Sequence, residues 1–232
     1  MTELYTRLYK FYDAEFGLKN LKDSRLKIST ISDLNDPFEF MGYRFKDRKE
    51  RVDWRGRIKS YFKNKGIICF CRDWRNPVIW SHYADKHRGI ALGFDVQSYG
   101  TIPVKYRTTR LDRPNKTEVL QTHITDLMQN SIAYKFSHWK YEKEVRTLEN
   151  LDNRNTENGL YFKEFDACLR LKEIIIGCRS EITSKTLHQN TDLKGIEVRT
   201  ARLAFKSFDV VQQRLKRLRA QPKTKLNDFS HL

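Results

Sequence analysis

Short apolar segments of strand length are the feature of this sequence that most restricts its fold. Residues 66–71, 89–95 and 171–176 each form a compact apolar run of the kind that fills a buried strand. No apolar run approaches the roughly 20 residues that a membrane-spanning helix needs. The chain is therefore expected to fold around a sheet.

The other predicted elements place strands through the middle of the chain, with helices early and in the centre. The expected strands are residues 4–12, 26–31, 66–71, 89–95, 102–107, 141–148, 160–165, 171–176 and 196–203. The expected helices are residues 13–22, 44–65, 78–86, 115–136 and 184–190. This order predicts a single α+β domain over residues 1–209, with a mixed, mostly antiparallel sheet and flanking helices. A basic C-terminal helix and tail are expected over residues 210–232.

The charge balance points to a polyanionic partner. The chain has 45 Lys and Arg against 29 Asp and Glu, which gives a net charge of +16. Such an excess accelerates association with nucleic acid, although a basic surface can also serve solubility alone. The N-terminus has no signal pattern, and the cysteines and histidines are poorly spaced for a metal site. We expect a cytoplasmic protein with no membrane partner and no bound metal.

Familiar catalytic motifs are missing from the sequence. It contains no G-x-G-x-x-G fingerprint, no P-loop, no H-E-x-x-H zinc motif and no G-x-S-x-G nucleophile elbow. Three polar clusters remain as candidates for a functional site.

The first cluster is Asn35-Asp36-Pro37-Phe38-Glu39. Asparagine or aspartate before proline favours an Asx-type turn with a fixed exit. The structural interpretation is that proline locks this turn and Phe38 packs in the core. The functional interpretation is that its polar side chains line a ligand site.

The second cluster runs from Trp80 to Gly89, with the sequence WSHYADKHRG. On a helix, Trp80, Tyr83 and His87 would share one face. Aromatic rings of this kind stack on nucleobases or nicotinamide, and histidine or arginine pairs with phosphate. The alternative is that Trp80 and Tyr83 anchor the core.

The third cluster is Tyr141-Glu142-Lys143-Glu144-Val145-Arg146. In a strand, Glu142, Glu144 and Arg146 point to the same face. Two neighbouring carboxylates repel each other, which can raise one pKa and lower the other for acid–base work, and Arg146 partly relieves the repulsion. The alternative is a charged strand edge that faces solvent.

The three clusters in this order resemble an uncharacterised bacterial family of unknown function. The motifs that carry the resemblance are YKF (residues 9–11), SDLNDPFE (32–39), CFC (69–71), WSHYADKHRG (80–89), WKYEKEVR (139–146) and LKEIIIG (171–177). The resemblance covers roughly residues 5–180, and the WSHY and YEKEVR segments are the most specific.

The plan of that family is similar to the ADP-ribosyltransferase superfamily, especially to its branch of toxins that modify nucleic acid. The resemblance implies an ADP-ribosyltransferase-like fold and transfer of ADP-ribose from NAD, as substrate, to RNA or DNA. It assigns the catalytic glutamate to Glu144, with Glu142 as the less favoured choice, and the aromatic position to Tyr83. The sequence departs from the superfamily by having Lys10 where a histidine or arginine is usual, and by a long separation of Tyr83 from Glu144.

The same resemblance implies the residues that contact NAD. They are Tyr9, Lys10, Asn35, Asp36, Trp80, Ser81, His82, His87 and Arg88. Lys10 and Arg88 are expected to hold the diphosphate, with Trp80 or Tyr83 stacked on nicotinamide or adenine. A protein of this kind is expected to be a toxin or an antiviral defence effector held in check by an antitoxin protein.

Two other functions fit the same residues. A nuclease would use Glu142, Glu144, Asp36 and His82 as its acid–base set. A non-catalytic RNA- or DNA-binding module would place lysine and arginine on phosphates and aromatic rings on bases.

Overall fold

The computed structural model describes residues 4–112, 121–152 and 159–219, without the side chains of residues 121–125. The chain divides into two compact units that alternate along the sequence. The first unit consists of Met1–Arg25, Asp73–Val96 and Glu164–Leu232. The second consists of Leu26–Arg72 and Gln97–Lys163. No single cut of the sequence separates them.

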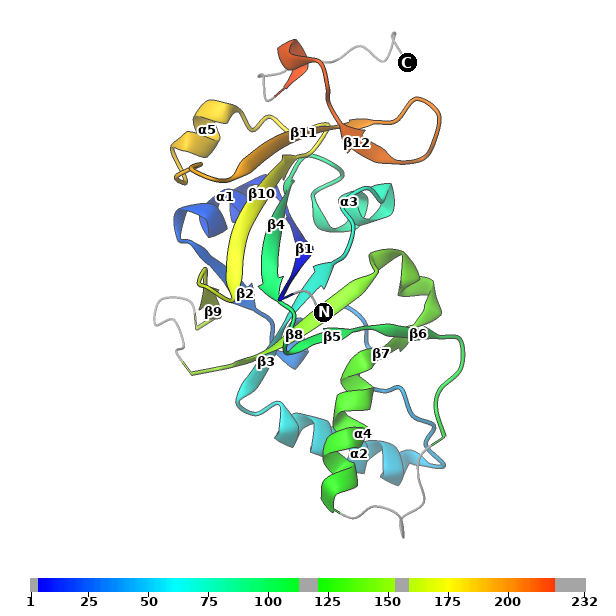
Figure 1. Cartoon of the computed structure of the whole chain (residues 1–232). Coiled ribbons are helices and arrows are strands. Elements are labelled where there is room, and N and C mark those ends of the chain that lie inside the picture. The colour runs from blue at the N-terminus through cyan, green and yellow to red at the C-terminus, as the bar shows by residue number, and fades with distance from the viewer. Residues whose placement is uncertain (1–3, 113–120, 153–158, 220–232) are drawn as a thin grey trace. The chain divides into compact units, whose positions relative to one another are not determined.

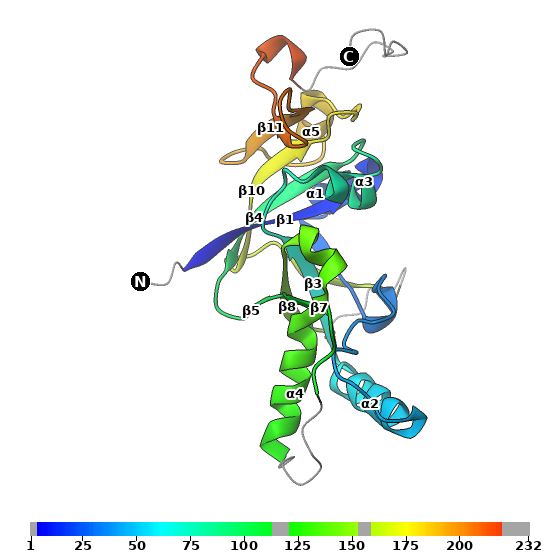
Figure 2. The ribbon, with the colours of Figure 1, turned by 90° about the vertical axis from the view of Figure 1, so that its right-hand side faces the viewer.

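The first unit is built on neighbouring strands in the order β12-β11-β10-β4-β1 (Figures 1 and 2). The strands are β1 (Tyr5–Tyr12), β4 (Ile90–Gln97), β10 (Leu169–Ile176), β11 (Glu197–Leu203) and β12 (Val210–Gln212). Strand β10 pairs antiparallel with β4 and parallel with β11, and β11 pairs antiparallel with β12. The helices are α1 (Ala14–Lys22), α3 (Pro77–Tyr83), α5 (Ser184–His188) and the 3-10 turn η4 (Lys216–Leu218).

Local sequence signals set the helix starts in the first unit. Asp13 caps α1 by accepting a hydrogen bond from the backbone N–H of Phe16 at 2.8 Å. Asn76 caps α3 in the same way, and Pro77 occupies the first helical position, where no N–H is needed. The helix predicted at residues 78–86 is shorter in the structure, where it ends at Tyr83.

Gly89 permits a close backbone approach at the start of β4. A Cβ atom at this position would lie 1.9 Å from the carbonyl oxygen of Tyr12. No side chain fits at that distance, so the glycine that closes the WSHYADKHRG motif is required by packing.

The second unit contains three sets of paired strands. The strands are β2 (Arg25–Ile28), β3 (Lys65–Cys71), β5 (Thr101–Pro103), β6 (Lys105–Arg107), β7 (Tyr134–Phe136), β8 (Glu144–Asn150) and β9 (Tyr161–Glu164). Strand β8 pairs antiparallel with both β3 and β5, β6 pairs parallel with β7, and β2 lies beside β9. The helices are α2 (Arg48–Tyr61) and α4 (Gln121–Ala133), with the 3-10 turns η1 (Ile31–Asp33) and η3 (Ser137–Glu142).

Helices α2 and α4 share the apolar core of the second unit (Figure 2). Trp54 and Ile58 of α2 pack in one cluster with Met128 and Ile132 of α4. Phe40 lies in the same cluster, and its carbonyl oxygen accepts a hydrogen bond from Nε1 of Trp54 at 2.9 Å. Ile132 of this core lies two residues before the start of β7.

The observed elements confirm the α+β class and the mixed, mostly antiparallel pairing. Some of the predicted helix and strand boundaries are wrong. The helix expected to reach Phe136 ends at Ala133, and residues 134–136 form β7; its expected start at 115–120 lies outside the described residues. Residues 102–107 fall in two short strands on either side of Val104. Residues 210–212 form β12 where a helix was expected, while the boundary at 209/210 stays a prediction.

Candidate active site

Five charged side chains of the second unit form one connected, buried network, called the carboxylate cluster below. The Lys135 ammonium lies 2.8 Å from Oε2 of Glu142, 3.0 Å from Oε2 of Glu144 and 3.2 Å from Oε1 of Glu39. Arg146 donates through Nε to Glu144 at 2.8 Å and through Nη2 to both oxygens of Glu39 at 2.9 Å. Because three carboxylates face two cations, the cluster carries an excess negative charge when all are ionised.

The backbone brings Glu142 and Glu144 together in an unexpected way. Glu142 is the last residue of η3, Glu144 is the first residue of β8, and Lys143 between them has a left-handed φ of 46°. The prediction that both glutamates lie in one strand is therefore wrong, because the strand begins only at Glu144. Neither glutamate faces solvent, since each is 4% exposed.

Neighbouring backbone and hydroxyl groups hold the cluster in place. Nη1 of Arg146 donates to the carbonyl oxygen of Ile132, the penultimate residue of α4, at 2.9 Å. The backbone N–H of Glu144 donates to the hydroxyl oxygen of Tyr106 at 2.7 Å. The end of α4 thus holds Arg146, and strand β6 holds the backbone of Glu144.

The pKa values of the two carboxylates nearest Arg146 move in opposite directions. Burial raises the pKa of Glu39 above its ordinary value, although Arg146 and Lys135 oppose the change. Burial also acts to raise the pKa of Glu144, but there the charges and hydrogen bonds of Arg146, with Lys135, outweigh it and lower the pKa to about 2. Carboxylates divided in this way can take the roles of proton carrier and permanent anion. The sequence predicted opposite pKa shifts within the pair Glu142 and Glu144. In the structure, the two carboxylates with opposite pKa shifts are Glu39 and Glu144.

The two cations of the cluster remain charged. Burial alone would lower the pKa of Lys135, but the carboxylates of Glu144, Glu39 and Glu142 outweigh it and raise the pKa above its ordinary value. The pKa of Arg146 is raised in the same way, against the effect of burial, by Glu144 and Glu39.

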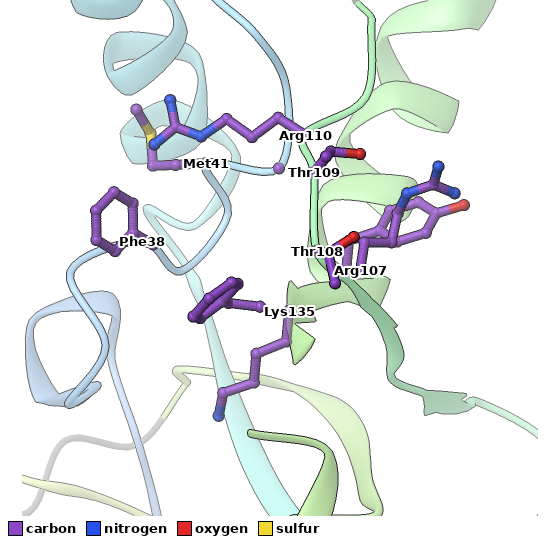
Figure 3. A pocket seen from close by; sticks show the side chains of 10 residues that line it. Phe38, Met41, Arg107, Thr108, Thr109, Arg110 and Lys135 are labelled. Carbon is purple, nitrogen blue, oxygen red and sulfur yellow. The ribbon is translucent and has the colours of Figure 1, made fainter. Parts of the chain in front are cut away.

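A cavity of about 270 Å³ in the second unit adjoins this cluster (Figure 3). This volume is close to the lower end of small-molecule sites, which is about 300 Å³. Its lining residues are Phe38, Met41, Gly42, Arg107, Thr108, Thr109, Arg110, Tyr134, Lys135 and Phe136. The cavity combines aromatic walls with two exposed arginines.

The arginines of this cavity lie beside aromatic rings. The guanidinium carbon of Arg110 lies 5.3 Å from the centre of the Phe38 ring, and that of Arg107 lies 5.9 Å from the centre of the Tyr134 ring. Phe38 is 59% exposed, so the prediction that it packs in the core is wrong; Phe40, two residues later, is the buried ring. The predicted Asx turn is confirmed, because Oδ1 of Asp36 accepts a hydrogen bond from the backbone N–H of Phe38 at 2.9 Å.

Lys135 joins the cavity to the carboxylate cluster. Its side chain lines the cavity, and in Figure 3 its ammonium points away from Phe38 and Met41. That ammonium is the atom that contacts all three glutamates. Lys135 thus belongs both to the lining of the cavity and to the carboxylate cluster.

The WSHYADKHRG motif lies in the first unit, where Trp80 and His87 are buried. Trp80 is completely buried, donates through Nε1 to the carbonyl oxygen of Trp74, and packs edge-on against Phe11 with ring centres 5.1 Å apart. Its indole packs in the core instead of presenting a face to a ligand, which corrects the expectation that Trp80 stacks on NAD. His87 stacks on Trp80, although α3 ends at Tyr83 and the two do not share a helix face. Ser81 reaches His87, with Oγ 3.4 Å from Nε2.

The remaining predicted site residues are divided between the units. Tyr9 and Lys10 lie on β1 of the first unit, where the Tyr9 hydroxyl donates to Glu173 at 3.0 Å and the Lys10 ammonium lies over the ring of Tyr12. His82, Tyr83 and Arg88 also belong to the first unit, and His82 and Arg88 are exposed there. The second unit contains Asn35, Asp36, Glu142 and Glu144. Within the second unit, the structure brings Glu142 and Glu144 together at Lys135.

Sequence reasoning missed Lys135, Arg107 and Arg110 as site residues. One signal was available, because Tyr134-Lys135-Phe136 repeats the aromatic–Lys–aromatic pattern of residues 9–11. Arg107 and Arg110 stand in a charged stretch that no local pattern distinguishes. Their role depends on where β6 places them beside β7.

A comparison with protein families gives one match. Residues 79–147 match the family described as protein of unknown function DUF2971. The match includes the WSHYADKHRG and WKYEKEVR motifs, together with Lys135 and the two arginines of the cavity. No curated protein and no solved structure matches the chain.

Among the described residues, no helix is long and apolar enough to cross a membrane. Nor do the described residues contain a group of three or more His, Cys, Asp or Glu side chains arranged to hold a metal ion.

Proposed function

We propose that the protein transfers ADP-ribose from NAD to a nucleic-acid acceptor, and that the second unit carries the reaction. The single observation that supports this best is the meeting of an arginine-bearing aromatic cavity with the negatively charged carboxylate cluster at Lys135. The motif resemblance to ADP-ribosyltransferases adds to it. In this proposal the protein is a cytoplasmic toxin or defence effector restrained by an antitoxin.

The cavity suits a nucleotide. Arg107 and Arg110 are exposed at its edge and can pair with a diphosphate through charge-assisted hydrogen bonds. Phe38 and Tyr134 offer rings for stacking a nicotinamide or adenine. The observed volume of about 270 Å³ accommodates one nucleoside-sized part of the dinucleotide, with the diphosphate at the exposed edge.

The carboxylate cluster suits the charge that develops during transfer. The bond between nicotinamide and C1′ of the ribose breaks with its electron pair going to nicotinamide, so that C1′ becomes positive. An acceptor atom then bonds to C1′ and releases its proton. A fixed negative group in a dry site stabilises the positive charge, and Glu144 stays ionised because its pKa is about 2. Glu39, whose pKa is raised, is the member of the cluster best suited to take up the proton.

Lys135 must move for this chemistry. Its side chain lines the cavity and its ammonium pairs with the three glutamates, so in this proposal the ribose takes the place of that ammonium at Glu144. The same displacement leaves the cluster with less positive charge at the moment when the ribose becomes positive. Lys135 is thus a positioning residue in this proposal, and Glu144 is the catalytic residue.

The test is incubation of the full chain with labelled NAD and separate samples of RNA, DNA and protein. We expect label in a nucleic-acid fraction and its loss in Glu144→Gln, which should also remove toxicity in cells. Glu149→Gln is the matched control, because Glu149 lies on the same strand but outside the carboxylate cluster. Arg110→Ala, at the exposed edge of the cavity, should weaken NAD binding without disturbing the buried charges.

Two outcomes would contradict the proposal. One is the absence of label from every fraction with folded wild-type protein. The other is labelling by Glu144→Gln at the wild-type rate. A thermal-shift titration separates the competing functions, because stabilisation by Mg²⁺ or Mn²⁺ favours a nuclease, and stabilisation by oligonucleotide alone favours a binding module.

A further inference from the structure

The loop of residues 204–209, which joins β11 to β12 in the first unit, exposes two phenyl rings. Phe205 is 92% exposed and Phe208 is 98% exposed. The loop is nevertheless closed, since the backbone N–H of Ala204 donates to the carbonyl oxygen of Asp209 at 2.9 Å. In Figure 1 this connection is the orange loop beyond the ends of the two strands. Single exposed apolar residues are common, but two nearly bare rings on one closed loop indicate a binding surface.

Two cations lie on or next to this loop. The guanidinium carbon of Arg202 lies 4.8 Å from the centre of the Phe205 ring, and Lys206 stands between the two phenylalanines. The segment after β12 is also basic and exposed; its cations are Arg214, Lys216, Arg217 and Arg219. Arg219 folds this segment back by donating to the carbonyl oxygens of Gln213 and Arg214. Residues 204–219 contain one acidic residue, Asp209. Its Oδ2 accepts a hydrogen bond from the Ser207 hydroxyl at 2.6 Å.

The chemistry of this surface fits single-stranded nucleic acid. Unpaired bases stack on exposed aromatic rings, and a row of cations follows the phosphates. A membrane-binding surface also combines aromatic and basic residues, but it buries a continuous apolar face. Here polar Lys206 and Ser207 separate the two rings, which suits two separate bases better than a lipid surface.

We propose that the loop 204–209, with Arg202 and the basic segment 214–219, binds single-stranded nucleic acid. Phe205 and Phe208 stack on bases, and the cations pair with phosphates. This inference rests on the proposed function insofar as nucleic acid is the acceptor there. The surface belongs to the first unit and the cavity to the second, so each can be disabled separately.

The experiment measures fluorescence anisotropy of a labelled 20-nucleotide single strand, as DNA and as RNA, with the full chain. The double variant Phe205→Ala/Phe208→Ala should bind at least about tenfold more weakly, since each stacked base contributes substantially to affinity. Tyr99→Ala is the matched control, because Tyr99 is 93% exposed in a turn and residues 97–101 contain no lysine or arginine. It should bind within about twofold of wild type. Lys216→Ala/Arg217→Ala should weaken binding and reduce its salt dependence.

Three results would overturn this inference. The first is wild-type affinity in the double phenylalanine variant. The second is equal affinity of the wild type for duplex and single strand, because paired bases cannot stack on the rings. The third is phenylalanine-dependent binding to phosphatidylserine vesicles in place of the oligonucleotide. If the double variant loses the oligonucleotide but keeps stabilisation by NAD, the surface and the cavity act separately. If NAD has no effect on either protein, the transfer proposal fails and the surface proposal stands.

Discussion

Arg146→Met removes the cation that holds two of the three buried carboxylates of the second unit. Arg146 is fully buried and donates to Glu144, Glu39 and the carbonyl oxygen of Ile132. Methionine is apolar, uncharged and shorter than arginine, so Lys135 remains as the cation that pairs with Glu39 and Glu144. Breaking a buried ion pair by removing one partner costs about 3–5 kcal/mol. We expect the free energy of unfolding to fall by that amount at pH 7.

Against the effect of burial, Arg146 contributes most to the lowered pKa of Glu144, which gives the pH dependence expected of this loss. The pKa is lowered from 4.5 to about 2, which corresponds to roughly 3 kcal/mol of stability at neutral pH. A lowered pKa stabilises the fold above the ordinary value of 4.5, and the contribution is lost as the pH falls toward 2. At pH 3 roughly half of it remains. The difference between wild type and Arg146→Met should therefore be larger at pH 7 than at pH 3.

Urea unfolding followed by circular dichroism at both pH values tests this expectation. Arg57→Met is the control, because Arg57 pairs with Asp53 at 3.0 Å on the exposed face of α2. Removing such an exposed helical pair should cost no more than about 0.5 kcal/mol. A loss below about 1 kcal/mol in Arg146→Met at pH 7, or an equal loss at pH 3, would refute the reasoning.

Three further substitutions test the packing. Gly89→Ala should destabilise the protein severely, by more than about 3 kcal/mol in urea unfolding, because its Cβ would lie 1.9 Å from the Tyr12 carbonyl oxygen; a smaller loss would show that the backbone adjusts. Gly56→Ala, in the open middle of α2, should instead raise stability by about 0.5–1 kcal/mol, and a decrease would contradict the helical assignment. Trp80→Phe should lower the free energy of unfolding by about 2–3 kcal/mol, because it leaves a cavity and an unpaired Trp74 carbonyl oxygen. An unchanged thermal unfolding temperature would argue against the buried position of Trp80.

Much of the fold could be predicted from the sequence because its signals are local. The cap at Asp13, the proline at the start of α3 and the apolar run of β3 act within a few residues of themselves. Such signals indicate that an element exists and fix its type. They fail where contact with another element determines the secondary structure. At residues 134–136 the apolar pattern of α4 continues, but pairing with β6 makes this segment a strand.

The candidate site shows the same division. The sequence identified Glu142, Glu144 and Arg146 as an acidic strand with a relieving arginine, and the contact of Arg146 with Glu144 is confirmed. It named Glu39 only within a separate cluster and could not pair it with Arg146, which lies 107 residues later in the chain.

What the sequence determined by itself was the α+β class, the approximate position of most elements and the charge of the chain. Only the tertiary structure decided which carboxylates share a site and which become more acidic. It placed Phe38 at a cavity and Phe40 in the core, and it introduced the left-handed residue Lys143 between two glutamates expected on one strand. The physical reason is that burial and Coulomb interactions depend on distances between atoms, and chain segments far apart in sequence set those distances. Alternation along a strand predicts a face only while the strand remains regular.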